Sequence, residues 1–262
     1  MLKQRVISAL ILIPIVLGLT YLGGPYFAAL VAAAALLAGY EFYSLMRQAG
    51  HRPYVVVGLG LIALLLVEVY DPGDALWRWA TAAAVMAPMI WRILQREGEG
   101  FLTDWALTLV GAVYVGLLAG HLVAVRNLPQ GLGWLLFTFA VTWVCDTAAY
   151  FVGTWWGKHG FFTHISPHKT WEGAVGGWLA GAVAAVVAGH WLGLALWQRL
   201  VLGVVLVLGV TFGDLAESLV KRQVGVKDSG RLIPGHGGML DRIDSLLFAG
   251  VIVYHFVTYV VL

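Results

Sequence analysis

The chain has 262 residues, of which 60% are hydrophobic and 11% are charged, and its formal net charge at pH 7 is +2. Soluble globular domains carry about 25% charged residues, so this composition excludes that class and indicates a multi-pass membrane protein. The single cysteine, Cys145, excludes an intramolecular disulfide and any zinc site built on several cysteines.

Long apolar segments recur along the chain. A helix needs about 20 mainly apolar residues to cross a hydrocarbon core about 30 Å thick. The sequence therefore predicts an all-α fold, a polytopic transmembrane bundle of about nine helices near residues 5–22, 26–46, 54–70, 75–95, 103–125, 132–152, 173–193, 199–217 and 244–262. The third segment is short and only three residues separate the first two, so a re-entrant or tilted pair is the alternative there. We interpret the first run as a retained helix, because no A-x-A-like cleavage site precedes Gly23.

Positive charge falls mainly on one predicted side of the membrane. If the N-terminus is cytoplasmic, thirteen of the 16 Lys and Arg residues lie on that side, and the exceptions are Arg78, Arg126 and Arg199. Short cytoplasmic loops accumulate Lys and Arg. We therefore expect a protein of the cell membrane whose N-terminus and polar loops face the cytoplasm.

Polar residues are distributed unevenly between two parts of the chain. Residues 1–130 read as structural, lipid-facing helices, with acidic exceptions at Glu41, Glu68 and Asp104. Residues 131–262 hold the unusual polar groups, so we predict a catalytic region there with cytoplasmic loops at 153–172 and 218–243. Gly177 and Gly181 form a small-xxx-small pattern, which is typical of closely packed helices.

The first polar cluster runs from Trp143 through Tyr150 to Lys158. Asp146 lies inside an apolar span, where a carboxylate is costly unless it pairs, protonates or faces water. A purely structural partner and a functional role both fit it. The stretch from Gly153 to Lys158 is not a P-loop, because it has three intervening residues instead of four and is followed by His159 in place of Ser or Thr.

The second cluster is ISPHKTWEG, residues 165–173, at the start of a predicted helix. Thr170 and Glu172 are suited to begin that helix, while Ser166 and Lys169 can present a hydroxyl and an ammonium group to a phosphate. A capped interfacial turn with a snorkelling lysine is the alternative.

Two histidines in this region do not predict a zinc site. His164 and His168 are four residues apart, but Pro167 opposes a regular helix between them. No acidic residue stands in the order that a helical zinc motif requires.

The third cluster contains two acidic pairs. GDLAES places Asp214 and Glu217 three residues apart, and GGMLDRIDS does the same for Asp241 and Asp244. On helices each pair shares a face, so two helix ends could direct several carboxylates at one point. Clustered carboxylates repel one another unless a cation neutralises them, and hard oxygen ligands suit Mg²⁺.

The residues between the acidic pairs suit a polyanion. Cationic side chains could neutralise a triphosphate, and glycines allow backbone amides to approach an anion. The cations are Lys221, Arg222, Lys227 and Arg231, and the glycines are Gly235, Gly237 and Gly238. A basic loop that only touches anionic lipid headgroups is the alternative, although it would not need the acidic pairs.

The stretch from Ser218 to Asp244, SLVKRQVGVKDSGRLIPGHGGMLDRID, resembles the signature of phosphatidate cytidylyltransferases, also called CDP-diacylglycerol synthases. The resemblance extends back through GDLAES and ISPHKTWEG to WVCDTAAYFVG, and more weakly to TLVGAVYVGLL. Thr154 departs from the family pattern, which has Arg after the glycine, and this puts a phosphate contact from that position in doubt.

The resemblance implies that the phosphate of phosphatidate attacks the α-phosphorus of CTP, giving CDP-diacylglycerol and pyrophosphate in phospholipid biosynthesis. It also implies Mg²⁺ as cofactor, and a second, monovalent cation could join it. CTP, phosphatidate and membrane lipid are the expected partners, nucleic acid is not, and the chain could form a homodimer.

Site roles follow from the motifs and the resemblance together. We assign catalytic roles to Asp214, Lys221, Asp241 and Asp244, and the three aspartates are the expected metal ligands. The expected substrate-binding residues are Ser166, Lys169, Ser218, Arg222, Lys227, Asp228, Arg231, His236, Gly237 and Gly238. Glu217 and Asp146 are secondary candidates.

Two other classes of function are compatible with parts of the pattern. A CTP-dependent lipid kinase would use similar groups but would transfer the γ-phosphoryl group to an alcohol. A transporter would show repeat symmetry and polar sites in both halves, which the plain N-terminal part does not offer.

Overall fold

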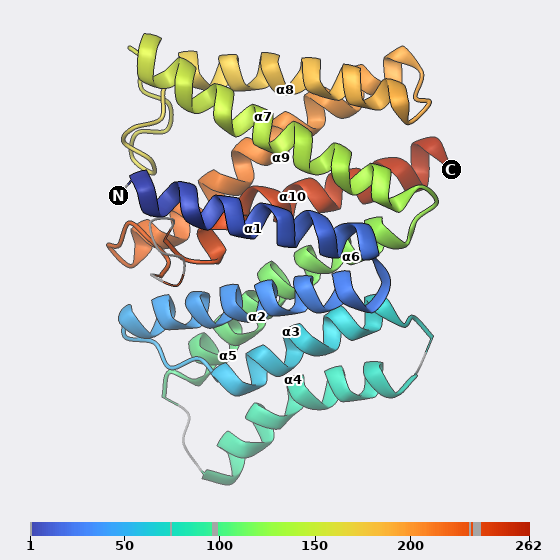
Figure 1. The fold of residues 1–262 in the computed structure, drawn as a ribbon. Coiled ribbons are helices and arrows are strands. Elements are labelled where there is room, and N and C mark those ends of the chain that lie inside the picture. The colour runs from blue at the N-terminus through green and yellow to red at the C-terminus, as the bar shows by residue number, and fades with distance from the viewer. Residues whose placement is uncertain (1, 74, 96–98, 231, 233–236) are drawn as a thin grey trace. The chain divides into compact units, whose positions relative to one another are not determined.

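A computed structural model describes residues 2–73, 75–95, 99–230, 232 and 237–262, and only the backbone of residues 2–9 and 76. Within this part of the chain the named elements are all helices, which confirms the all-α part of the predicted fold class (Figure 1). They are α1 (Leu2–Leu22), α2 (Gly24–Gln48), α3 (Val55–Tyr70), α4 (Ala75–Gln95), α5 (Phe101–Gly111), η1 (Ala112–Leu117), α6 (Leu118–Asn127), α7 (Gly131–Trp156), α8 (Trp171–Trp191), α9 (Leu196–Gln223), α10 (Leu240–Phe256) and η2 (Val257–Val261).

The π-helical turn η1 joins α5 to α6 in one continuous helix, and η2 continues α10. The described residues therefore form nine helical segments, which agrees with the predicted number. Six are long and apolar enough to cross a membrane, namely Gly24–Gln48, Phe101–Asn127, Gly131–Trp156, Trp171–Trp191, Leu196–Gln223 and Leu240–Val261. Leu10–Leu22 and Val55–Tyr70 are shorter apolar helices. This pattern is that of a multi-pass membrane protein.

The chain forms two compact units. Unit 1 contains residues 1–124 and 223–242, and unit 2 contains residues 125–222 and 243–262. The predicted division at residue 130 separates structural helices from the region expected to carry the chemistry. The two compact units describe packing and do not test that division, so it stays a prediction.

A buried tyrosine organises the centre of unit 1. Tyr43 of α2 is fully buried, and its hydroxyl donates a hydrogen bond to the Thr108 carbonyl of α5 at 2.7 Å. Gly58 and Gly111 lie against its ring, where an added Cβ would come within 2.3–2.5 Å of ring carbons. Small residues are therefore needed where α3 and α5 meet α2.

Glycines also allow close helix packing in unit 2, as the small-xxx-small pattern predicts. A Cβ at Gly177 of α8 would lie 2.8 Å from the Cys145 carbonyl oxygen of α7, and one at Gly181 would lie 3.1 Å from the Cys145 Cβ. On α9, a Cβ at Gly213 would lie 2.8 Å from the Asp244 carbonyl oxygen of α10. The backbones of α9 and α10 thus approach each other at the acidic motifs.

Helix α9 continues past residue 217, where the sequence suggested that the apolar span ends. It runs to Gln223 and carries Lys221 and Arg222 in its last turn. Positive side chains at a helix C-terminus interact favourably with the helix dipole, and the pairing of Glu217 with Lys221 four residues later supports the same turns.

Candidate functional site

Residues in the first turn of α8 anchor the segment between α7 and α8. Thr170 is the N-cap of that helix, and its Oγ1 accepts a hydrogen bond from the Gly173 amide at 3.2 Å, which confirms the predicted helix start. Glu172 accepts hydrogen bonds from the amides of Lys158 at 3.1 Å and His159 at 3.2 Å. Its Oε1 also lies 2.5 Å from His159 Nδ1. Glu172 therefore holds the segment's N-terminal end.

The ISPHKTWEG motif forms the predicted turn. The Lys169 amide donates to the Ser166 carbonyl at 3.2 Å, so the turn spans residues 166–169. Lys169 Nζ lies 2.8 Å from Asp214 Oδ2, and Arg222 Nε donates to the Ile165 carbonyl at 2.8 Å. Two predicted substrate-binding cations thus join this turn to helix α9.

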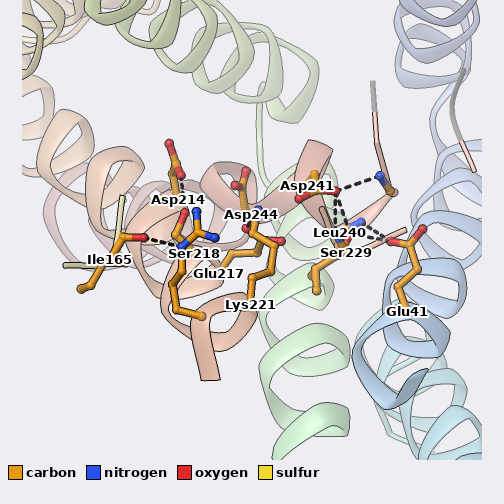
Figure 2. A network of polar contacts seen from close by, with 12 residues as sticks. Glu41, Ile165, Asp214, Glu217, Ser218, Lys221, Ser229, Leu240, Asp241 and Asp244 are labelled. Carbon is orange, nitrogen blue, oxygen red and sulfur yellow. Dashed lines mark hydrogen bonds and ion pairs between the residues drawn. The ribbon is translucent and has the colours of Figure 1, made fainter. Parts of the chain in front are cut away.

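The acidic residues of GDLAES lie in different environments (Figure 2). The Asp214 side chain is 37% exposed, and its Oδ1 accepts a hydrogen bond of 3.3 Å from the Ser218 hydroxyl. Glu217 is fully buried and forms an ion pair with Lys221. Glu217 thus holds the Lys221 ammonium group in place. Removing either partner would leave an uncompensated buried charge, which is strongly destabilising.

Asp214 and Asp244 come together in unit 2. Their helices touch at Gly213, and Asp244 has Asp214, Asp146 and Lys221 as charged neighbours. Asp244 Oδ1 accepts a hydrogen bond of 2.7 Å from the Ser245 amide. Three carboxylates and a lysine therefore share one region near the ends of α9 and α10, and Lys169 joins them through Asp214.

In unit 1, Asp241 organises the segment before α10. Its Oδ2 accepts hydrogen bonds from the Ser229 amide at 3.0 Å, the Ser229 hydroxyl at 2.9 Å and the Gly238 amide at 2.8 Å. Gly237 has a φ of 82°, and a Cβ there would lie 2.8 Å from the same oxygen. The two predicted substrate-binding glycines, Gly237 and Gly238, thus bring their backbone close to the carboxylate.

The remaining predicted site residues are exposed or lie outside the described residues. Lys227 and Asp228 are exposed. Arg231 and His236 lie outside the described residues, as does Gly235. Sequence reasoning missed Glu41 of α2, whose carboxylate contacts Ser229, Met239 and Leu240. A carboxylate inside an apolar segment was the available signal for it.

Carboxylate oxygens are ligands of the kind that Mg²⁺ takes, and the magnesium site stays a prediction. Among the described residues, no group of three or more His, Cys, Asp or Glu side chains is arranged to hold a metal ion. Mg²⁺ usually takes one or two protein carboxylates together with water and substrate phosphates, however, and Asp214 and Asp244 supply such oxygens. Asp241 belongs to the other unit, so a joint metal role for the three aspartates stays a prediction.

Comparison with known proteins identifies the family. The model of the cytidylyltransferase family matches residues 3–260. The chain is 37% identical to a phosphatidate cytidylyltransferase of Brucella suis, with 97% of this chain and 93% of the relative covered. It is 33% identical to a phosphatidate cytidylyltransferase of a Synechocystis species, with 97% and 96% covered. This chain belongs to the cytidylyltransferase family.

Proposed function

We propose that this chain is a phosphatidate cytidylyltransferase, which transfers CMP from CTP to phosphatidate and yields CDP-diacylglycerol and pyrophosphate. The relatives that match nearly the whole chain carry that name. The structural observation that supports it best is the gathering of Asp214 and Asp244 with Lys169 and Lys221 near the ends of α9 and α10. Such a mixed cluster suits a substrate whose several negative charges must be held and partly neutralised.

Charge neutralisation and positioning account for most of phosphoryl-transfer catalysis. The Lys169 ammonium group is held beside Asp214 and the Lys221 ammonium group beside Glu217, so both are fixed before substrate arrives. Preorganised cations cost little reorganisation when negative charge develops on a phosphoryl group. We propose that Arg222 and Lys227 add further positive charge for the triphosphate.

We further propose that Asp214, Asp241 and Asp244 hold Mg²⁺. When bound, a divalent cation would neutralise phosphate oxygens and orient the α-phosphate of CTP. The hard oxygen donors support this choice of metal. A second, monovalent cation and a homodimer are further proposals.

The enzyme would act at the cytoplasmic face of the cell membrane. The six apolar helices support a membrane location, and the bias of thirteen Lys and Arg residues to one side supports this orientation. CTP is water-soluble and phosphatidate is a membrane lipid, so a site at the ends of α9 and α10 would give both substrates access.

The test is an assay of purified protein with phosphatidate and CTP labelled at either the α- or the γ-phosphorus. Label at the α-position should enter the lipid, and thin-layer chromatography should identify CDP-diacylglycerol. Entry of γ-label into the lipid would instead support a CTP-dependent lipid kinase and overturn the proposal.

A further inference from the structure

Glu41 is one of the few acidic residues among the apolar helices of residues 1–130, and it is buried. Glu41 lies on helix α2 of unit 1 and is 7% exposed. Oε1 accepts a hydrogen bond from the Met239 amide at 3.0 Å, and Oε2 accepts one from the Leu240 amide at 2.8 Å. Both oxygens of the carboxylate therefore bind the backbone where α10 begins, 199 residues away in the sequence.

These two amides need acceptors. The first N–H groups of an α-helix have no partner inside the helix, and α10 begins at Leu240. A carboxylate near a helix N-terminus is also favoured by the helix dipole. Glu41 thus supplies from a distant helix the acceptor that a neighbouring capping side chain usually supplies.

The same carboxylate is linked to Asp241 through one hydroxyl group. Ser229 Oγ lies 3.1 Å from Glu41 Oε2 and 2.9 Å from Asp241 Oδ2 (Figure 2). A serine hydroxyl has a single hydrogen, so it can donate fully to only one of the two oxygens at a time. The position of Asp241 therefore depends on Glu41 through Ser229 as well as through the start of α10.

Two glycines lie directly against this group of side chains. An added Cβ at Gly238 would lie 2.2 Å from Ser229 Oγ and 2.4 Å from Glu41 Oε2, and one at Gly230 would lie 2.5 Å from Glu41 Oε1. Real Cβ atoms do not approach other atoms so closely. Glycine at both positions allows the backbone there to lie directly against the Glu41 carboxylate.

We propose that Glu41 is a positioning residue for the transferase reaction: it fixes the backbone of Met239 and Leu240 at the start of α10 and, through Ser229, orients the Asp241 carboxylate. The proposal rests on the proposed function for the role of Asp241, while its geometric basis is independent of that function. Glu41 itself contacts the protein backbone and a serine, and it acts on the reaction through these groups.

A carboxylate is required at this position because each of its two oxygens faces a backbone N–H group, which can only donate. Glutamine would keep the shape but would turn an NH₂ group, which only donates, towards the N–H of Met239 or Leu240. One charge-assisted hydrogen bond would then be lost and two donors would face each other. This should loosen the attachment of Met239 and Leu240 to α2. Aspartate is shorter by one methylene group and should not reach the amides from α2.

Asp104 offers a matched control. It is another carboxylate of unit 1, it is also 7% exposed, and its Oδ1 accepts a hydrogen bond from the Arg52 amide at 2.7 Å. Asp104→Asn therefore disturbs a buried carboxylate and a backbone contact of the same kind, but not the contacts with Ser229, Met239 and Leu240. It separates a general loss of stability from the local effect proposed for Glu41.

The first readout is tryptic cleavage after Lys227, which is exposed and lies two residues before Ser229. With protein purified in detergent, we expect Glu41→Gln to be cleaved there at least about fivefold faster than wild type, because cleavage reports local opening. Ser229→Ala, which removes only the bridging hydroxyl, should show a smaller increase. Asp104→Asn should stay within about twofold of wild type.

The second readout is turnover as a function of Mg²⁺ concentration. Glu41→Gln should lower kcat roughly tenfold or more and raise the Mg²⁺ concentration for half-maximal rate by a similar factor, since Asp241 is displaced. Asp104→Asn should leave that concentration unchanged.

The two readouts fail in different ways. Wild-type cleavage after Lys227 in Glu41→Gln, or equal acceleration in Asp104→Asn, overturns the positioning role. Accelerated cleavage with unchanged kcat and unchanged Mg²⁺ requirement also overturns it, because the segment would then be held for stability alone. If the wild-type enzyme turns over without Mg²⁺, the proposed metal role of Asp241 falls, and the cleavage comparison still decides whether Glu41 holds the segment.

Discussion

Lys169 Nζ lies 2.8 Å from Asp214 Oδ2, so the turn that precedes α8 is joined to α9 by an ion pair between two residues of the predicted site. The Lys169 side chain is 24% exposed and that of Asp214 is 37% exposed, so water reaches both partners. Partly exposed ion pairs contribute little to stability. The pair is therefore compatible with the proposed roles of Lys169 at a phosphate and Asp214 at a cation.

The first prediction concerns Lys169. Replacing it with alanine removes a charge-assisted contact to phosphate, so Lys169→Ala should lower kcat/KM for CTP by roughly ten- to a hundredfold. His168→Ala, at an exposed neighbouring position, should change kcat/KM by less than about twofold. The measurement is steady-state CDP-diacylglycerol formation at varied CTP. Equal losses in the two variants would show that the turn acts through folding alone.

The second prediction concerns the metal. Asp244 lies beside Asp214, and its loss should weaken Mg²⁺ binding, so Asp244→Asn should reduce turnover by at least about a hundredfold. Part of the loss should be recovered by raising the Mg²⁺ concentration. Asp71→Asn, at an exposed position after α3, is the control and should behave like wild type. Normal activity and normal Mg²⁺ dependence in Asp244→Asn would remove this residue from the metal site.

The helices could be predicted from sequence because the membrane sets the length of each apolar run. Thr170 could be predicted as a helix start because capping depends on residues next to it in the chain. The contacts of Glu41 could not be predicted, since its partners lie 188 to 199 residues away and no local pattern encodes such a pairing. The end of α9 was placed too early, because the buried pair of Glu217 and Lys221 continues the helix beyond its apolar part.

The third prediction concerns topology. In a variant with Cys145 replaced by alanine, a cysteine at exposed Gln223 should react with a membrane-impermeant maleimide only after the cells are permeabilised. A cysteine at Leu262 should react in intact cells. The reason is the bias of Lys and Arg to one side, which predicts that the end of α9 faces the cytoplasm. The reverse labelling pattern would invert the proposed orientation.

The last prediction concerns the close approach of α9 and α10. A methyl group at Gly213 would lie 2.8 Å from the Asp244 carbonyl oxygen and 3.1 Å from Ser245 Cα, so Gly213→Ala must push the two helices apart. Overpacking of this kind costs about 1–3 kcal/mol and should lower the thermal unfolding midpoint in detergent. Because Asp214 and Asp244 lie at this contact, turnover should fall at least about tenfold even at temperatures where the variant stays folded.

Gly60→Ala is the matched control for this substitution. Gly60 lies within helix α3, and a Cβ there would have no atom within 4 Å. Alanine stabilises a helix interior by about 0.5–1 kcal/mol relative to glycine, so this variant should be as stable as wild type or slightly more so. A Gly213→Ala enzyme with wild-type turnover and a wild-type unfolding midpoint would mean that the contact of α9 with α10 is looser than described and does not set the spacing of Asp214 and Asp244.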